Sequence, residues 1–497
     1  MAHARQTYGD SEPASMLPPL MLPPLMFVPW LVLGATYGLL SSPTPDRFGA
    51  GEVLVGGLLI ATVGLRALHK LASLAIPGGI GRDRGIADLM VVVLVLVVPL
   101  ATGFLRGNRV EDMVRDLVPA VYFLVPLMVV TGAATPSWLV PALASALLVA
   151  GSGFATRHLL SGDFALNTFG EQTYFGCIDY FVLDPAVLFT GAFGLALFVM
   201  AIIESRSPVL ILAGACLATV PAVAIGATVI RSQIAVLVIV GLFCMGRSFR
   251  ISLATLFGMA LALSALVAGY AVFGDRLAGL VELIGHKQQA VGLANGRELE
   301  IRAVWSEMTA GYDLFLFGKG WGGTIVHPLG LAGQEWRFVH IFPFYLLMKV
   351  GLAGSILLVP LLLRLAGTAR FLLVSPEVPL TERAMALGCI ASLSINLTVS
   401  AGFKMLGLGL VMALLLALFA RRRSALAPDR PPVLPDPAGP KEAAPDRARA
   451  RPPRRIVPQV PPRSALHPPE SDTRTPAGNG TPHPRVRRGN RAARNSA

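Results

Sequence analysis

The sequence predicts an all-α polytopic membrane protein with about 12 transmembrane helices. Of its 497 residues, 54% are hydrophobic and only 14% are charged, whereas soluble domains carry about 25% charged residues. The hydrophobic residues form blocks of about 17 to 25, the length of a helix that crosses a hydrocarbon core of about 30 Å. Blocks such as 89–105 and 253–272 are apolar on all sides, unlike the alternating strands of a transmembrane barrel. These observations exclude a soluble enzyme and a barrel.

The apolar blocks divide the chain into five parts. A short cytoplasmic N-terminus (1–19) precedes nine spans (20–273), a long periplasmic segment (274–339), three more spans (340–420) and a C-terminal tail (421–497). The expected spans are 20–41, 52–72, 88–105, 117–132, 137–155, 180–203, 208–229, 232–246, 251–273, 340–364, 383–400 and 403–420. An even number of spans places both termini on one side of the membrane.

The distribution of Lys and Arg indicates which connections face the cytoplasm. If the N-terminus is cytoplasmic, most basic connections are cytoplasmic too: 66–84, 204–206, 247–250, 364–383 and the tail from Arg421. The connection 106–115 is an exception, because it is basic and falls on the other side. The connection 157–180, the turn at Arg231 and the segment 274–339 share that other, periplasmic side.

The C-terminal tail carries most of the excess charge of the chain. Residues 421–497 contain 17 Lys or Arg and 6 Asp or Glu, a net charge of +11 out of +13 for the whole chain. The tail is rich in Pro, Ala and Arg and almost lacks aromatic residues, so we expect it to be disordered. A cytoplasmic polybasic segment is attracted to anionic lipid headgroups. The charge therefore predicts contact with membrane lipids and no nucleic-acid partner.

The segment 274–339 is the longest connection without a transmembrane signal, and such connections are usually functional. Its first part, 276–308, has helical spacing of apolar residues, and a glycine-rich turn follows at 318–323. We expect short helices at the outer membrane–water interface that cover a cavity. The four cysteines form no paired motif, so the sequence predicts neither a disulfide framework nor a metal site.

Three arginines lie on this side of the membrane. Arg231 opens a span, where it could simply anchor the helix end at the interface. Arg297 and Arg302 lie in one helical stretch, and a guanidinium presents a planar fork of donors that matches phosphate oxygens. The alternative is a solvated helix in which Glu298 and Glu300 pair with these arginines. The sequence therefore predicts either a diphosphate site or ordinary surface charges.

His340 begins the tenth expected span. A histidine accepts a proton near neutral pH, so it could act as a general base on a sugar hydroxyl. A purely structural role is the alternative, and His327 competes for the catalytic one.

The order of these features carries more information than any one of them. Between residues 223 and 365 they follow as Arg231, the pair Gly296-Arg297, Trp305, the glycines 318, 320 and 322, His340, Tyr345 and the glycines 351 and 354. This order resembles the O-antigen ligase and O-antigen polymerase family, a group of lipid-linked glycan transferases of the bacterial inner membrane.

The resemblance implies glycosyl transfer from an undecaprenyl diphosphate-linked glycan to an acceptor hydroxyl at the periplasmic face, without a metal or other cofactor. Arg231 and either Arg297 or Arg302 would hold the diphosphate, and His340 would deprotonate the acceptor. Further candidates are His327, Trp305 and Tyr345. The acceptor would be a growing glycan for a polymerase and the lipid A core for a ligase.

Two other classes of protein fit a chain with this many spans. A secondary transporter or permease tends to have repeated halves and ionisable residues in mid-membrane. The expected spans are nearly free of charges, and the long polar segment interrupts any symmetry. A non-catalytic membrane scaffold with a recruiting tail is the third class, in which replacing Arg231 or His340 would change nothing.

Overall fold

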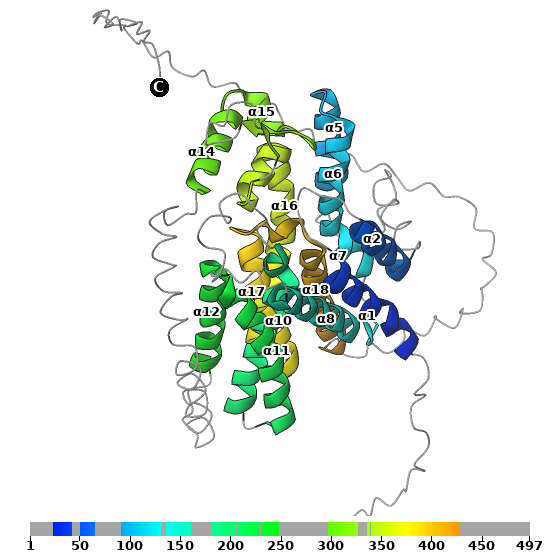
Figure 1. The fold of residues 1–497 in the computed structure, drawn as a ribbon, viewed down its shortest axis with the longest axis vertical. Helices are drawn as coiled ribbons and strands as arrows, with labels where there is room; N and C mark the ends of the chain where they lie inside the picture. Colours follow the sequence, from blue (N-terminus) through cyan, green and yellow to red (C-terminus); the bar gives the residue numbers. More distant parts are fainter. Residues whose placement is uncertain are drawn as a thin grey trace, which may run out of the picture. The chain divides into compact units, whose positions relative to one another are not determined.

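The described part of the chain is almost entirely helical (Figure 1). A computed structural model describes residues 23–41, 50–64, 91–130, 136–160, 180–204, 206–228, 230–247, 297–326, 335–337 and 339–426. The expected span 251–273, His327 and the tail beyond Leu426 lie outside these residues. Within them, the only sheet is a two-stranded antiparallel hairpin, β1 (Ile325–Val326) and β2 (Glu335–Trp336), in which Ile325 is paired with Trp336.

Helices occur at every expected span that the structure describes. They are α1 (Pro23–Leu40), α2 (Ala50–Val63), the π-helix η1 (Val93–Val97), α5 (Val98–Leu105), α6 (Val110–Val121), η2 (Tyr122–Leu124), α7 (Val125–Val129), α8 (Leu139–Leu160), η3 (Tyr180–Leu183), α10 (Pro185–Ile203), α11 (Pro208–Ala227), α12 (Arg231–Arg247), α16 (Phe342–Val374), α17 (Leu380–Asn396), η4 (Ala401–Lys404) and α18 (Leu406–Leu426). The long segment adds α14 (Arg297–Met308) and α15 (Tyr312–Phe317).

Four of these helices, α8, α10, α11 and α16, are each long and apolar enough to cross a membrane. Local sequence explains where two of them begin. Asp184 and Ser207 cap α10 and α11 by accepting from the backbone N–H two residues on, and a proline follows each cap at the first helical position. Proline is favoured there because its missing N–H would have no partner in the helix.

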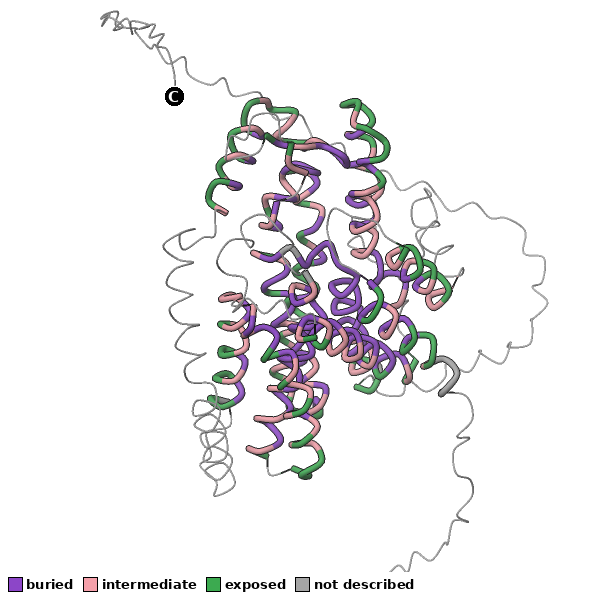
Figure 2. Tube along the Cα trace, viewed as in Figure 1, coloured by how far each residue is buried: buried purple, intermediate pink, exposed green. Residues whose placement is uncertain are grey.

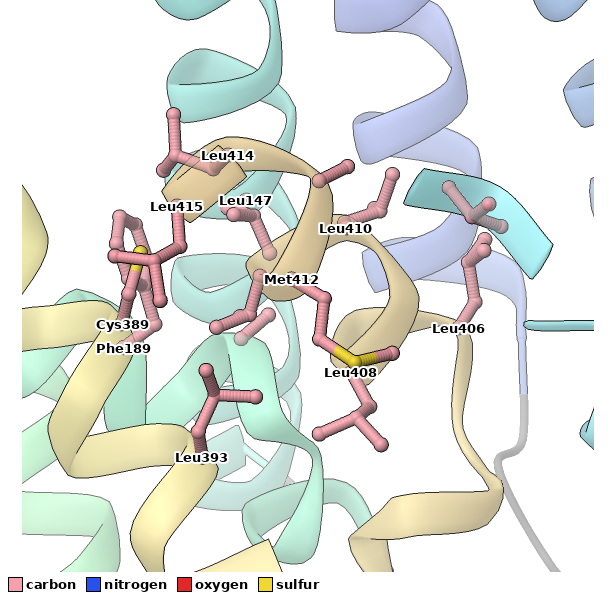
Figure 3. Close-up of a cluster of buried hydrophobic side chains, with 14 of the residues drawn as sticks. Leu147, Phe189, Cys389, Leu393, Leu406, Leu408, Leu410, Met412, Leu414 and Leu415 are labelled. Carbon is pink, nitrogen blue, oxygen red and sulfur yellow. The ribbon is translucent and has the colours of Figure 1, made fainter. Parts of the chain in front are cut away.

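The core surrounds α10, which packs on α8, α11, α12 and α17. Small residues allow close approach, since a Cβ added at Gly194 would lie 2.5 Å from the backbone N of Ala218 on α11. Small residues at such interfaces are typical of helix packing in membranes. Figure 2 shows that burial is highest in this region, and Figure 3 shows Leu147, Phe189 and Cys389 from three helices meeting leucines of α18.

The two ends of the helix bundle carry different contacts. At one end, Arg422 of α18 forms a bidentate pair with the buried Glu382 at the start of α17. At the other end, the amide of Phe342 at the start of α16 donates to Thr398 O, beyond the end of α17. Helix α18 continues through Arg421, where the tail was expected to begin, to Leu426.

Helix α16 is longer than the expected span 340–364, because it runs from Phe342 to Val374 and includes Arg364 and Arg370. Its backbone is broken at Gly351, where φ is +67°. A non-glycine residue is unfavourable in this conformation. The break also brings Gly351 against α15, since an added Cβ would lie 2.3 Å from Leu316 O.

We expect Gly351→Ala to destabilise the protein and Gly367→Ala, on the same helix, to leave it unchanged or stabilise it. Alanine at Gly351 would add about 1–3 kcal/mol of backbone strain, as well as the clash with Leu316 O. A Cβ at Gly367 meets nothing within 4 Å, and alanine is favoured over glycine in a helix by about 1 kcal/mol. Thermal unfolding of the two purified variants in the same detergent would compare them. Equal unfolding temperatures would contradict the assigned break.

Candidate functional site

His340 lies next to a buried carboxylate. Its Nδ1 is 2.8 Å from Oε1 of Glu300 on α14, and its backbone N–H donates to the other oxygen of the same carboxylate at 3.0 Å. The side chain of Glu300 is 6% exposed and that of His340 is 26% exposed. Because a carboxylate accepts hydrogen bonds, this contact places the ring proton on Nδ1, so that Nε2 is the ring nitrogen that carries the lone pair. A buried carboxylate therefore fixes the orientation of the imidazole through two hydrogen bonds.

The packing of α14 explains why Glu300 faces the histidine. Glu300, Val304 and Met308 are the buried residues of this helix, and their spacing of four places them on one face. Helix α14 packs on α16, which begins two residues after His340. Glu300 is therefore not a solvated residue of a surface helix, because this face of α14 is turned inward.

The two arginines of α14 have different surroundings. Arg297 lies one turn before Glu300, and its guanidinium donates to the backbone carbonyl of Val399 beyond α17. Partial burial lowers the pKa of Arg297, and the nearby Glu300 carboxylate opposes this effect. Arg302 pairs instead with Glu298 at 2.5 Å, and their side chains are 73% and 65% exposed. The structure therefore places Arg297, and not Arg302, on the side of His340.

The other predicted residues that the structure describes lie on three different helices. Arg231 begins α12, which packs on α10 and α17, whereas α14 packs on α16. Trp305 is 51% exposed on α14 and makes an edge contact with Phe315. Tyr345 is buried one turn after His340, with the Lys404 ammonium 4.6 Å from its ring centre. The described contacts join His340 to α14, while Arg231 begins a different helix.

A glycine-rich turn connects α15 to the hairpin and docks on the broken helix. Gly318, Gly320 and Gly322 all have positive φ, between 69° and 80°. The amides of Lys319 and Gly320 donate to the carbonyls of Met348 and Lys349, just before the break at Gly351. On the other side, Asn108 donates from its side chain to the carbonyls of Lys319 and Trp321, both at 2.8 Å. The turn is thus fixed between α5 and α16.

A buried ion pair lies beneath this turn. Lys349 of α16, which is fully buried, donates to Asp116 of α6 at 2.5 Å and to the carbonyl of Gly323 at 2.6 Å. Asp116 also accepts from the backbone N–H of Gly322 at 2.9 Å. Sequence reasoning missed this pair, although one signal was present. Lys349 is an ionisable residue inside an apolar span, and such residues are usually functional.

The connection 106–115 contacts the long segment through Arg106 and Asp112. Arg106 donates to Asp313 of α15 at 2.9 Å, and Arg337 after β2 pairs with Asp112 of α6 at 2.9 Å. The hydrogen bond from Arg106 holds the pKa of Asp313 below its ordinary value. This connection and the described residues of 297–340 therefore contact each other.

A small apolar cavity lies behind Tyr345. Its lining includes Val91, Phe123, Trp321, Phe403 and the aliphatic part of Lys404. Its volume of about 20 Å³ holds about one water molecule. A lipid-linked glycan does not fit in this cavity, so a large substrate would have to bind elsewhere on the face that carries His340.

No protein-family model and no curated protein matches this chain.

Proposed function

We propose that this chain is a membrane glycosyltransferase that moves a glycan from undecaprenyl diphosphate to an acceptor hydroxyl in surface polysaccharide. The observation that carries the proposal is the pair of hydrogen bonds from His340 to the buried Glu300. A histidine held in this way suits general-base catalysis. Arg297, on the same side of α14, supplies the cation that a diphosphate requires.

The proposed reaction is a single displacement. Nε2 of His340 takes the proton of the acceptor hydroxyl, whose oxygen attacks the anomeric carbon of the donor glycan. The bond from that carbon to the diphosphate oxygen breaks, and undecaprenyl diphosphate leaves with the electron pair. Arginines that hold the leaving diphosphate stabilise the charge that develops there in the transition state. Attack opposite the leaving group inverts the anomeric centre.

The remaining parts of the proposal follow from the arrangement of spans. The protein lies in the bacterial inner membrane with 12 spans and cytoplasmic termini, and His340 faces the periplasm. The exposed hydrophobic side chains of α11 and α12, such as Leu212 and Ile239, suit contact with lipid. The acceptor is a growing glycan if the protein is a polymerase and the lipid A core if it is a ligase.

Gel profiling of surface polysaccharide in a deletion strain tests this function. We expect wild type to restore the glycan, and His340→Ala and Arg231→Ala to fail at equal membrane abundance. Single repeat units accumulate if the protein is a polymerase, whereas unattached polymer accumulates if it is a ligase. Full complementation by both variants would refute the assignment.

Arg297→Ala and Arg302→Ala form a matched pair within this test, because both remove a guanidinium from α14. We expect Arg297→Ala to abolish the glycan and Arg302→Ala to preserve it, since the Arg302 side chain is 73% exposed and pairs with Glu298. Exposed ion pairs contribute little to the stability of a protein. Equal effects of the two substitutions would contradict the assignment of Arg297 to the site.

A secondary transporter or permease for a small or lipid-linked solute is the second candidate. The observation that favours it is a helix broken at Gly351 next to the buried pair of Lys349 and Asp116, because broken helices and buried ionisable residues occur at transport sites. A transporter would retain function with His340→Ala, whereas the transferase would lose it.

A further inference from the structure

We infer that Asp112 and Asp116 are positioning residues that hold His340 in place through the backbone at the two ends of the hairpin. Their importance for catalysis rests on the proposed function, whereas their effect on the position of His340 does not. Neither residue contacts His340 in the described structure, so each acts through the segment between α15 and α16.

The two acids lie on the buried face of α6. Asp112, Met113, Asp116 and Ala120 are its buried residues, and the exposed fractions of the two acids are 6% and 3%. Residues four apart lie above one another on a helix. A buried carboxylate is unfavourable unless it has partners. Asp112 is paired with Arg337, and Asp116 is paired with Lys349 and with the backbone N–H of Gly322.

Asp116 holds the start of the hairpin. It accepts from the N–H of Gly322 at 2.9 Å, and its ion-pair partner Lys349 donates to the carbonyl of Gly323 at 2.6 Å. The Gly322–Gly323 unit is thereby held from both sides. The turn packs closely on α6, because a Cβ added at Gly322, whose φ is +80°, would lie 3.0 Å from the backbone N of Met113. Strand β1 begins two residues later, at Ile325.

Asp112 holds the end of the hairpin. It pairs at 2.9 Å with Arg337, which directly follows β2. The exposed side-chain fractions of the pair are 9% for Asp112 and 26% for Arg337. One turn of α6 therefore holds the chain both before β1 and after β2.

Arg337 is only three residues before His340. Because three residues span at most about 10 Å, the position of Arg337 limits where the histidine can lie. His340 must stay 2.8 Å from Glu300 to keep its hydrogen bond. The base of the hairpin therefore determines whether the histidine meets its carboxylate.

The position of His340 can be measured without any assay of function. Diethyl pyrocarbonate modifies accessible neutral imidazoles, and mass spectrometry gives the rate at each histidine of the full-length protein in nanodiscs. His158, which is 2% exposed, is the internal reference for global unfolding. The variants are Asp112→Asn, Asp116→Asn and the charge swap Asp112→Arg with Arg337→Asp. Glu111→Gln is the matched control, because Glu111 lies on α6 with its side chain 70% exposed.

We expect Asp112→Asn and Asp116→Asn to raise the rate at His340 several-fold while His158 remains slow. The charge swap should return the rate toward wild type, and Glu111→Gln should not change it. In a transfer assay, the two single variants should lower kcat and leave KM unchanged, because the base is displaced while the substrate contacts remain.

The inference is overturned if both single variants leave the rate at His340 at the wild-type value, or if the charge swap stays as reactive as Asp112→Asn. If Asp116→Asn does not fold, Asp112→Asn decides the outcome, since it keeps the pair of Asp116 and Lys349. If the acid variants expose His340 and His340→Ala still transfers glycan, the positioning role stands and the proposed function fails. If His340→Ala abolishes transfer and the acid variants behave as wild type, the proposed function stands and the positioning role fails.

Discussion

Replacing His340 with alanine is expected to lower the rate of glycan transfer by about 10²- to 10⁴-fold, the contribution typical of a general base. The acceptor hydroxyl would then have to lose its proton without a base at bonding distance. Glu300→Gln should lower the rate by a smaller factor, because the amide keeps the size of the side chain but loses the charge that stabilises a protonated imidazole. Transfer by purified protein in lipid vesicles, with saturating donor, measures both effects.

The matched control for Glu300→Gln is Glu298→Gln on the same helix. Glu298 is 65% exposed and pairs only with Arg302 among its described contacts, so its replacement should leave the rate unchanged. A rate for His340→Ala within twofold of wild type, with intact thermal stability, would exclude the histidine as the base. If Glu300→Gln and Glu298→Gln lower the transfer rate equally, the rate depends on the charge of α14 and not on the contact with His340.

Replacing Lys349 with methionine is expected to produce the largest loss of stability of any substitution considered for this chain. It would leave the carboxylate of Asp116 buried at 3% exposure without its cation, and breaking one side of a buried pair costs about 3–5 kcal/mol. The double variant Asp116→Asn with Lys349→Met should be more stable than Lys349→Met alone, because no buried charge remains unpaired. Thermal unfolding in detergent compares the three proteins.

The exposed pair of Glu298 and Arg302 provides the reference for this comparison. These residues are four apart on α14, and such exposed helix pairs contribute about 0.3–0.5 kcal/mol. Replacing both by alanine should therefore change the unfolding temperature far less than Lys349→Met. If Lys349→Met unfolds at the wild-type temperature, the pair with Asp116 does not form in the folded protein.

The positions of the helices could be predicted from the sequence because long apolar runs are typical of helices that cross a membrane. The ends of α16 and α18 could not, since tertiary contacts determine them. Helix α18 extends beyond its apolar part, where Arg422 pairs with Glu382. Gly351 breaks α16 where the glycine-rich turn docks, and a single glycine in an apolar helix does not by itself indicate a break. The number of membrane crossings remains a prediction, because among the described helices four are long and apolar enough by themselves.

The predicted site is incomplete for a related reason. His340 and the two arginines of α14 were recognisable as residue types that suit the chemistry, but their partners depend on how α14 is rotated. Apolar residues occur on more than one side of this helix, with Leu299 exposed and Val304 buried, so its sequence does not show that Glu300 faces inward. Asp112 and Asp116 were missed because they precede an apolar span and resemble ordinary residues of a connection.

The most direct test of the central claim is transfer by the purified protein in vesicles that contain a glycan on undecaprenyl diphosphate and an acceptor. We predict release of one undecaprenyl diphosphate for each glycan joined to the acceptor, with the release lost in His340→Ala. Joining of glycan without dependence on His340 would contradict the assigned base. Movement of the lipid-linked glycan between leaflets without release of diphosphate would contradict the transferase itself and favour a transporter.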